Sequence, residues 1–236
     1  MKIMTFNTQH CASYLDKQHR IDFDLMAKAI RMFDPDVVGL NEMRGQGPTN
    51  HPDFKDQVAI LSELTEMKHY YFAPAIELPD GLYGNGLLSK TPFLSVEKIM
   101  IPDPVERGYD GYYETRCIIK AVLEGGITVL VTHMGLNPDE QENAVNTVIS
   151  LIEDKKCVLM GDFNMQPENP ILTPIFDRMT DTATFFDSEK MSFPSDAPDR
   201  KIDYIFVSGD VKVDFADIPS VVASDHRPHG AIVDMR

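Results

Sequence analysis

The chain has 236 residues, 43% of them hydrophobic and 25% charged, which is typical of a globular protein with one large domain spanning residues 1–236. The formal net charge of −15 disfavours a long nucleic acid as the partner, because binding its phosphates requires clustered Lys and Arg. No apolar run approaches the ~18 residues that cross a bilayer, and no secretory leader is recognisable, so we expect a cytoplasmic protein without a membrane partner.

Short apolar runs alternate with amphipathic segments in the first half of the chain. Their spacing predicts, in chain order, a strand at Lys2–Phe6, a helix over Phe23–Phe33, a strand at Val37–Leu40, a helix over Gln57–Leu64, and strands at Tyr70–Ala73, Gly84–Ser89 and Leu94–Ile99. Thr91-Pro92 separates the last two strands, which favours a hairpin between them.

The second half contains stronger turn signals. Glu124-Gly125-Gly126 predicts a tight hairpin, and Asn137 is a suitable N-cap for a helix of about four turns. The elements predicted here are strands at Cys117–Leu123 and Ile127–Thr132, a helix from Pro138, a strand at Val158–Met160, a hairpin of Ile202–Val207 with Val211–Phe215, and a last strand at Gly230–Val233. Because hairpins outnumber parallel crossovers, we expect mainly antiparallel sheets packed face to face with helices outside.

Polar residues able to bind a metal or a phosphate follow one strand after another. A turn explains any one of them, but not their repetition. If they converge, several carboxylates share one pocket and raise one another's pKa, a penalty that a divalent cation removes. Oxygen ligands without thiolates favour Mg²⁺, with Mn²⁺ as the alternative, over zinc. The series is Asn7, Glu42, Asn85, His133, Asp162 with Asn164, Asp203, and Asp225 with His226.

Seven short motifs, taken together, resemble those of the endonuclease/exonuclease/phosphatase superfamily, the deoxyribonuclease I-like group. In order they are Thr5-Phe6-Asn7, Leu40-Asn41-Glu42, Gly84-Asn85-Gly86, Thr132-His133, Gly161-Asp162-Phe163-Asn164, Ile202-Asp203-Tyr204-Ile205-Phe206 and Ser224-Asp225-His226-Arg227-Pro228. The resemblance runs from Asn7 to Pro228. It implies an α+β fold, a four-layer αββα sandwich with its site at one edge, and hydrolysis of a phosphate ester by an activated water without a covalent intermediate.

The resemblance and the local geometry together suggest a metal site and a water-activating residue. Asn7 and Glu42 are expected to bind the metal, with Glu42 supplying the charge and Asn7 orienting it. Asp162 is expected to orient or deprotonate the attacking water, and Asn164, two residues on and therefore on the same face of an extended chain, to donate to the phosphate. A simple Asx turn is the alternative for this pair.

Asp225 and His226 are neighbours, and neighbours on an extended chain point to opposite sides. We therefore predict that Asp203, from another strand, pairs with His226, which contacts the phosphate as an imidazolium or by proton transfer. Asp225 is then expected to face the metal or the water.

Four further residues match the family's pattern. The resemblance implies phosphate contact for His133 and substrate contact for Asn85, although a structural histidine and a left-handed turn are the alternatives. Glu114 and Arg116 resemble a Glu-x-Arg feature of the family, for which an internal ion pair and phosphate contact by Arg116 are both open. The remaining histidines are predicted to be surface or incidental residues: His10, His19, His51, His69 and His229.

A small phosphorylated substrate is the leading prediction, with a DNA or RNA nuclease as the alternative and an inactive binding module as the third reading. Two segments could set substrate choice. Arg44–Asp53 is rich in Gly and Pro, and Pro102–Tyr113 has three tyrosines that could stack on a base or sugar or could pack the loop. Neither is rich in Lys or Arg, which disfavours the nuclease reading. The sequence does not indicate an oligomeric state.

Overall fold

A computed structural model describes residues 1–47 and 55–235 and shows two six-stranded sheets. The first has the order β11-β12-β1-β2-β4-β3 and the second the order β5-β6-β7-β8-β10-β9. The strands of the first sheet are β1 (Lys2–Asn7), β2 (Val37–Gly45), β3 (His69–Leu78), β4 (Gly81–Ser89), β11 (Lys212–Asp217) and β12 (His229–Asp234). The strands of the second are β5 (Phe93–Met100), β6 (Cys117–Leu123), β7 (Ile127–His133), β8 (Cys157–Asp162), β9 (Met179–Asp181) and β10 (Asp203–Ser208).

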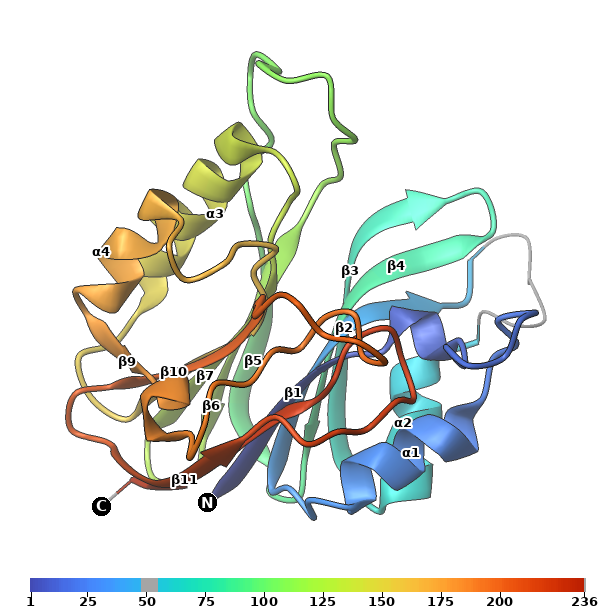
Figure 1. The fold of residues 1–236 in the computed structure, drawn as a ribbon, viewed down its shortest axis with the longest axis horizontal. Coiled ribbons are helices and arrows are strands. Elements are labelled where there is room, and N and C mark those ends of the chain that lie inside the picture. Colours follow the sequence, from blue (N-terminus) through green and yellow to red (C-terminus); the bar gives the residue numbers. More distant parts are fainter. Residues whose placement is uncertain (48–54, 236) are drawn as a thin grey trace.

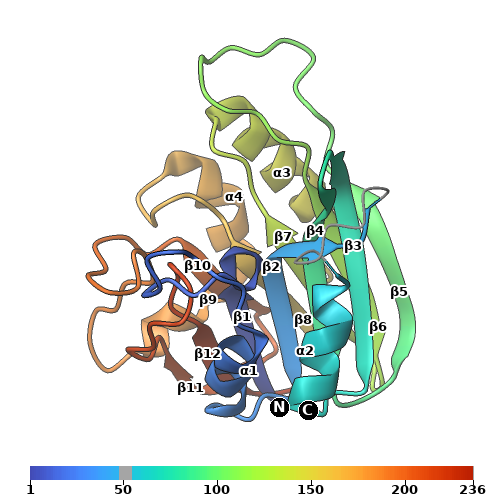
Figure 2. The ribbon, with the colours of Figure 1, turned by 90° about the vertical axis from the view of Figure 1, so that its right-hand side faces the viewer.

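The sheets pack face to face and helices cover their outer faces, which makes four layers (Figure 1). The outer elements are α1 (Phe23–Arg31) and α2 (Gln57–Thr65) on the first sheet, α3 (Pro138–Leu151) and α4 (Thr173–Phe176) on the second, and the short 3-10 helices η1 (Gln9–Cys11), η2 (Pro170–Leu172) and η3 (Thr182–Phe185). Both termini lie together at one end, opposite the loop that projects between β5 and β6 (Figure 2). The predicted αββα sandwich is therefore confirmed.

Three apolar clusters match these layers. The cluster between the sheets joins residues of both, such as Ile3 and Val37 from the first and Val131 and Met160 from the second. Separate clusters lie beneath α1 and α2 and beneath α3 and α4. The central pairs β1·β2 and β7·β8 are parallel and the other pairs are antiparallel, in keeping with the mainly antiparallel expectation.

Two of the predicted hairpins are wrong. β4 and β5 belong to different sheets, and so do β10 and β11. The turns at Thr91-Pro92 and around Gly209 reverse the chain as expected, but they carry it across the sandwich to the other sheet. A local turn signal reports a change of direction and not the partner strand, because two sheets about 10 Å apart are within reach of a short connection.

One hairpin was missed. β3 and β4 pair from His69↔Ser89 to Leu78↔Gly81, so β3 is much longer than the predicted Tyr70–Ala73 strand. Pro74, which cannot donate a ladder hydrogen bond, lies at a register shift within β3. The proline therefore marks a bulge rather than the end of the strand.

Candidate active site

The central strands of both sheets end at the same edge of the sandwich. Asn7 at the end of β1 is in register with Asn41 of β2. His133 at the end of β7 is in register with Asp162 at the end of β8, and Asp203 begins β10 directly opposite Asp162. The structure therefore brings together predicted residues from the beginning, the middle and the end of the chain.

A bulge in β2 directs Glu42 into this edge. Between Leu40↔Gly86 and Met43↔Gly84, two residues of β2, Asn41 and Glu42, face one residue of β4. Glu42 has φ of 60°, in the left-handed region, and its side chain remains 24% exposed. Bulges re-aim side chains in this way, and here the result is a carboxylate that is partly open to solvent.

Gly161 allows β7 and β8, neighbouring strands of the second sheet, to approach closely just before Asp162. Its φ is 148°, and an added Cβ would lie 1.8 Å from the carbonyl oxygen of Thr132. Only glycine fits there. The Gly-Asp pair thus has a physical basis: the glycine permits close β7–β8 contact and Asp162 follows at the edge.

The predicted pairing of Asp203 with His226 is confirmed. His226 Nδ1 lies 2.8 Å from Asp203 Oδ2, and His226 Nε2 lies 3.6 Å from Asp162 Oδ2. All three residues are buried, and their ligand atoms lie within 4.8 Å of one another. Burial opposes the charge on His226, but the carboxylates of Asp203 and Asp162 outweigh it and raise the pKa of the imidazole. The two carboxylates thus favour the imidazolium form of His226.

The side chain of Asn7 connects this cluster to Glu42. Its Nδ2 donates to Glu42 Oε1 and to Asp162 Oδ2, at 3.0 Å each, while its Oδ1 accepts from the backbone N–H of Gln9 at 3.0 Å. The amide therefore presents donors to the centre and orients Glu42. Direct ligation by Asn7 would require its oxygen to face inward and would break the bond from Gln9.

Arg116 fixes the tautomer of His133. Arg116 Nη1 lies 2.9 Å from His133 Nδ1, and since guanidinium can only donate, Nδ1 must accept. The proton of the neutral ring is then on Nε2, which lies 3.2 Å from Asn164 Nδ2, another donor. One N–H of Asn164 goes to the carbonyl of Met134. His133 Nε2 also lies 3.6 Å from Asp162 Oδ2, so its N–H is within reach of the carboxylate at the centre of the site.

Of the two readings for Arg116, the internal ion pair is the one observed. The guanidinium is 2.5 Å from Glu114 Oε1 and 3.4 Å from the hydroxyl of Tyr83. Arg116 is buried, so its contact with the centre goes through His133. Burial and then Arg116 lower the pKa of His133, which agrees with a neutral ring.

Asn164 is not on extended backbone as predicted. Its φ is 53°, and its backbone N–H donates to Asp162 Oδ1 at 2.9 Å, so an Asx turn is present. The Asx turn is the reading observed, and it places the amide of Asn164 beside His133. Phe163 is buried in the core beneath α3, as expected.

Asn85 differs most from its prediction. It lies within β4 rather than in a left-handed turn, its Oδ1 accepts from Asn41 Nδ2 at 2.8 Å, and its Nδ2 donates to the carbonyl of Cys117 at 2.8 Å. The structure favours a bridge between the sheets over substrate contact. Asn41, which the sequence reading missed, donates further to Thr132 and accepts from the N–H of Asp162. The sequence feature that could have identified Asn41 is its position next to Glu42.

Two of the histidines predicted to be surface or incidental residues are buried or lie beside the site. His229 is buried, with Nε2 3.0 Å from Thr182 Oγ1, and burial lowers its pKa to about 3. His10 lies beside the site, with Nδ1 4.0 Å from Glu42 Oε2. His19 is exposed and His69 half-buried in β3. His51 lies outside the described residues.

The donor set fits a hard cation. Burial raises the pKa of Glu42, and the charge of Asp225 adds to this. Burial likewise raises the pKa of Asp162. Asp203 Oδ1 is buried without a hydrogen-bond partner among the described residues. Crowded, partly orphaned carboxylate oxygens are the environment that a divalent ion stabilises. The three cysteines are free and buried, at Cys11, Cys117 and Cys157.

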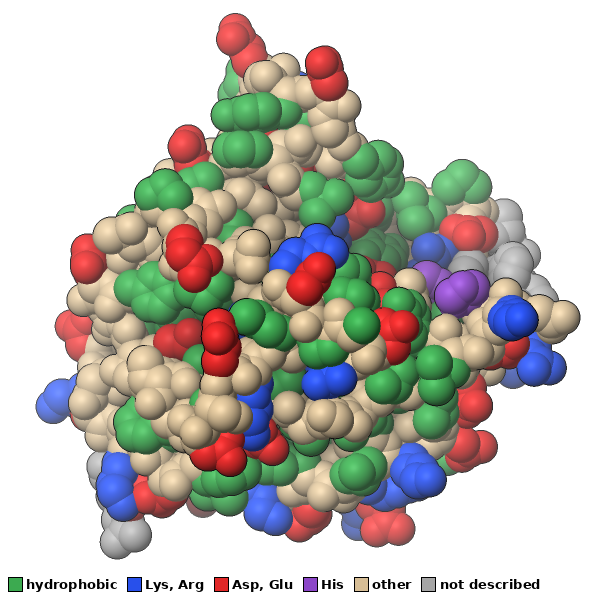
Figure 3. Space-filling model, viewed as in Figure 1, with side chains coloured by type: hydrophobic (Ala, Val, Ile, Leu, Met, Phe, Trp, Pro, Cys, Tyr) green, Lys and Arg blue, Asp and Glu red, His purple; other side chains and the backbone are tan. Residues whose placement is uncertain are grey.

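The face that carries this edge is hollowed between the projecting loop and the β3–β4 arm, and acidic side chains lie in the hollow (Figure 3). Lys and Arg are scattered singly among them. Of the loop tyrosines, Tyr113 packs by donating its hydroxyl to Asp139 at 2.7 Å, whereas Tyr109 and Tyr112 are exposed. Arg44 is buried in β2, and residues 48–53 of the Arg44–Asp53 segment lie outside the described part.

A sequence model described as the Endonuclease/Exonuclease/phosphatase family matches residues 4–226. The chain belongs to this family. The match spans the whole site from Asn7 to His226, and the family's name describes hydrolases of phosphate esters. A search of curated proteins gives no match. Along the described residues, no helix has the length and apolar character needed to cross a membrane.

Solved structures show the same fold. An endonuclease/exonuclease/phosphatase from Beutenbergia cavernae DSM 12333 has a TM-score of 0.79 and 23% identity, covering 100% of this chain and 71% of the other. A mannosyl-6-phosphatase from Bacteroides thetaiotaomicron VPI-5482 has a TM-score of 0.74 and 15% identity, covering 99% of each chain. TDP2 from D. rerio, complexed with a single-strand DNA product, has a TM-score of 0.66 and 17% identity, covering 99% of this chain and 98% of the other.

Proposed function

We propose that this member of the endonuclease/exonuclease/phosphatase family is a Mg²⁺-dependent phosphoesterase that hydrolyses a small phosphate ester with an activated water. The observation that carries the proposal is the buried cluster of Asp162, Asp203 and His226, joined by Asn7 to the partly open Glu42. The raised pKa values of Glu42 and Asp162 and the orphan oxygen of Asp203 are typical of a functional site.

Contacts and charges assign a role to each residue. Glu42 and Asp225, whose charge acts on Glu42, would hold the cation, and Asn7 orients Glu42. When bound, the ion polarises a phosphate oxygen and stabilises the leaving alkoxide. Asp162, in contact with Asn7 and near His226, orients or deprotonates the attacking water.

The phosphate would be held by donors of three side chains. His226, whose charge Asp203 favours, and His133, whose Nε2–H is set by Arg116, would donate to its oxygens together with the amide of Asn164 beside His133.

Hydrolysis of p-nitrophenyl phosphate and bis(p-nitrophenyl) phosphate with and without Mg²⁺ tests the proposal. We expect Mg²⁺-dependent release of nitrophenol, its loss in EDTA, its recovery with Mn²⁺, and little activity in His226→Ala. Glu42→Gln should require much more Mg²⁺ for half-maximal rate, since it removes the charge and keeps the shape. An unchanged Mg²⁺ titration in this variant would remove Glu42 from the metal site.

A nuclease is the second candidate, favoured by the likeness in fold to TDP2 with its DNA product. The net charge of −15 and the scattered basic side chains on the hollowed face oppose it. Activity on plasmid, abasic and single-stranded oligonucleotides, compared with the generic esters at the same enzyme concentration, decides between the two.

A further inference from the structure

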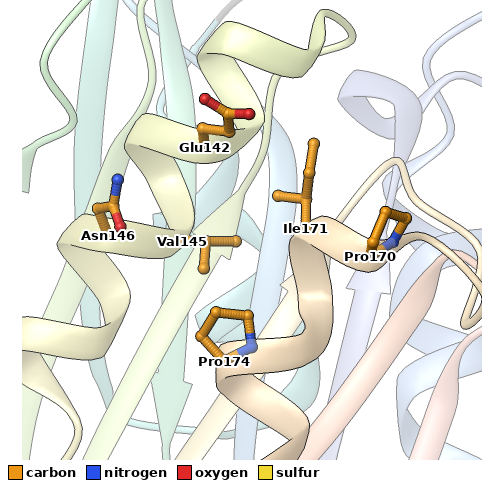
Figure 4. A pocket seen from close by; sticks show the side chains of 6 residues that line it. All are labelled: Glu142, Val145, Asn146, Pro170, Ile171 and Pro174. Carbon is orange, nitrogen blue, oxygen red and sulfur yellow. The ribbon is translucent and has the colours of Figure 1, made fainter.

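A pocket of about 560 Å³ opens directly beside the catalytic edge. Asn164 forms the boundary, since its amide contacts His133 on one side and lines the pocket on the other. Its lining includes Leu136, Asn164, Gln166, Glu168, Asn169 and Arg200. Another pocket, of about 400 Å³, lies between α3 and the η2–α4 segment and contains no residue of the catalytic cluster (Figure 4).

Arg200 is held in place by a stack that starts at the catalytic histidine. The ring of Phe193 packs 4.7 Å from the ring of His226, and the guanidinium of Arg200 lies 4.6 Å from the centroid of Phe193. Asp199 accepts from Arg200 Nε at 3.2 Å. The two terminal nitrogens of Arg200 have no hydrogen bond to another described residue, and the side chain is 49% exposed, so the guanidinium can offer donors at the pocket.

The lining chemistry suits hydroxyl groups. Gln166, Glu168 and Arg200 carry planar groups with adjacent donors or acceptors, which match pairs of neighbouring hydroxyls, whereas the Oδ1 of Asn169 accepts from the N–H of Ile171 and leaves its amide N–H groups as donors. Leu136, 56% exposed, offers an apolar surface for C–H groups. The carboxylates of Glu168 and Asp199 balance the charge of Arg200, which disfavours a second phosphate. Among the described residues, no aromatic ring lines this pocket, and a base would find no platform there on which to stack.

We propose that this pocket binds the polyhydroxylated alcohol of the phosphate ester, a sugar or a cyclitol, and that Arg200 determines this preference. The inference rests on the proposed function, because it requires the scissile phosphate to lie beside Asn164. It narrows the substrate class to esters whose alcohol carries neighbouring hydroxyls.

Glucose 6-phosphate and n-hexyl phosphate test it, because both are monoesters of a primary six-carbon alcohol and differ in the hydroxyls and the ring. If the enzyme is a diesterase, the phosphodiesters that join p-nitrophenol to the same two alcohols serve as the substrate pair. We expect kcat/KM to be at least ~10-fold higher for the sugar ester, the effect of one or two added hydrogen bonds. Equal kcat/KM within the pair, or a preference for AMP over glucose 6-phosphate, overturns the inference while the proposed function stands. Failure to cleave any ester, including the p-nitrophenyl esters, overturns both.

Substitution of Arg200 tests the residue. Arg200→Gln should raise KM for the sugar ester by about 10-fold with kcat nearly unchanged, so that the preference over the hexyl ester falls. Gln166→Ala should act in the same direction. Arg20→Gln is the matched control, because Arg20 is also exposed and paired with a nearby aspartate, Asp16, but lies far along the chain from this pocket. An unchanged preference in Arg200→Gln removes Arg200 from the subsite.

Discussion

The ring of His226 is fixed on two sides. Asp203 binds its Nδ1 at 2.8 Å and Phe193 packs against its face. Because Asp203 is buried, its charge acts on the imidazole with little screening from solvent. Asp203 therefore sets both the orientation and the protonation state of His226, and its effect on the reaction passes through that ring.

Asp203→Asn keeps the shape of the side chain and removes its charge. We expect kcat to fall about 10²- to 10⁴-fold, the usual range for a lost general acid or base and its orienting partner. The pKa of His226, followed by NMR in the metal-free protein, should drop. Circular dichroism should confirm that the fold is kept. A kcat within threefold of the parent value would contradict the role given to this pair.

His229 makes stability depend on pH. Its folded pKa is about 3, against 6.5 for the free side chain, so between these values the unfolded chain binds the proton and the folded one does not. The contribution of His229 to the free energy of unfolding is fully present above about pH 6.5. It falls by about 1.4 kcal/mol per pH unit as the pH decreases towards 3.

Urea unfolding at pH 7.5 and pH 5.0 measures this effect. The loss of stability between the two pH values should be about 2 kcal/mol smaller in His229→Gln, where the titrating ring is gone. Comparing the variant with the parent protein cancels the other titrating groups, including His133. An equal loss in both proteins would show that His229 does not titrate as inferred.

At this scale the sequence allowed the Asp203–His226 pairing to be predicted, because adjacent residues on an extended chain point apart and Asp225 was thereby excluded as the partner. It did not allow Asn41 or Asn85 to be placed. Their amides bond to Thr132, Cys117 and Asp162 across the sandwich. Those partners are distant in sequence, so no local pattern identifies them.

At the level of the strands, the β2 bulge and Asn41 join the two sheets next to Glu42. Asn41→Ala would leave the N–H of Asp162, the carbonyl of Thr132 and the amide of Asn85 without this partner. We expect the free energy of unfolding to fall by about 3 kcal/mol, since buried groups that lose a partner cost ~1–3 kcal/mol each. Urea unfolding measures it. Asn146→Ala, on the exposed side of α3, serves as the control and should change stability by less than ~1 kcal/mol.

The strands themselves were predicted better than their partners. Most predicted segments are strands in the structure, because alternation and apolar runs depend on local sequence. Assigning β4 with β5 and β10 with β11 failed, since pairing is a tertiary property and both connections cross between sheets. The site edge was nonetheless found, because it depends on where strands end and not on which strands pair.

The charge of the whole molecule bears on substrate size. With a net charge of −15, long-range electrostatics repel a polyanion, whereas a small ester meets mainly the local donors of the site. Raising NaCl from 50 to 200 mM should leave kcat/KM for a small ester nearly constant or raise it slightly. A nuclease that neutralises 6–10 phosphates would lose about 10³- to 10⁵-fold in affinity over this range. Such a loss, seen with oligonucleotides cleaved faster than small esters, would favour the alternative function.

The order of the motifs along the chain made the family resemblance recognisable, and the four-layer fold was predicted from that resemblance. The proposed chemistry depends most on where the metal ion binds. Crystals grown with Mn²⁺ and measured at its absorption edge show that location directly. We expect an anomalous peak within bonding distance of Glu42, at the edge shared with Asp162 and Asp225. A well-ordered Mn²⁺ elsewhere in the molecule, with none at Glu42, would contradict the account.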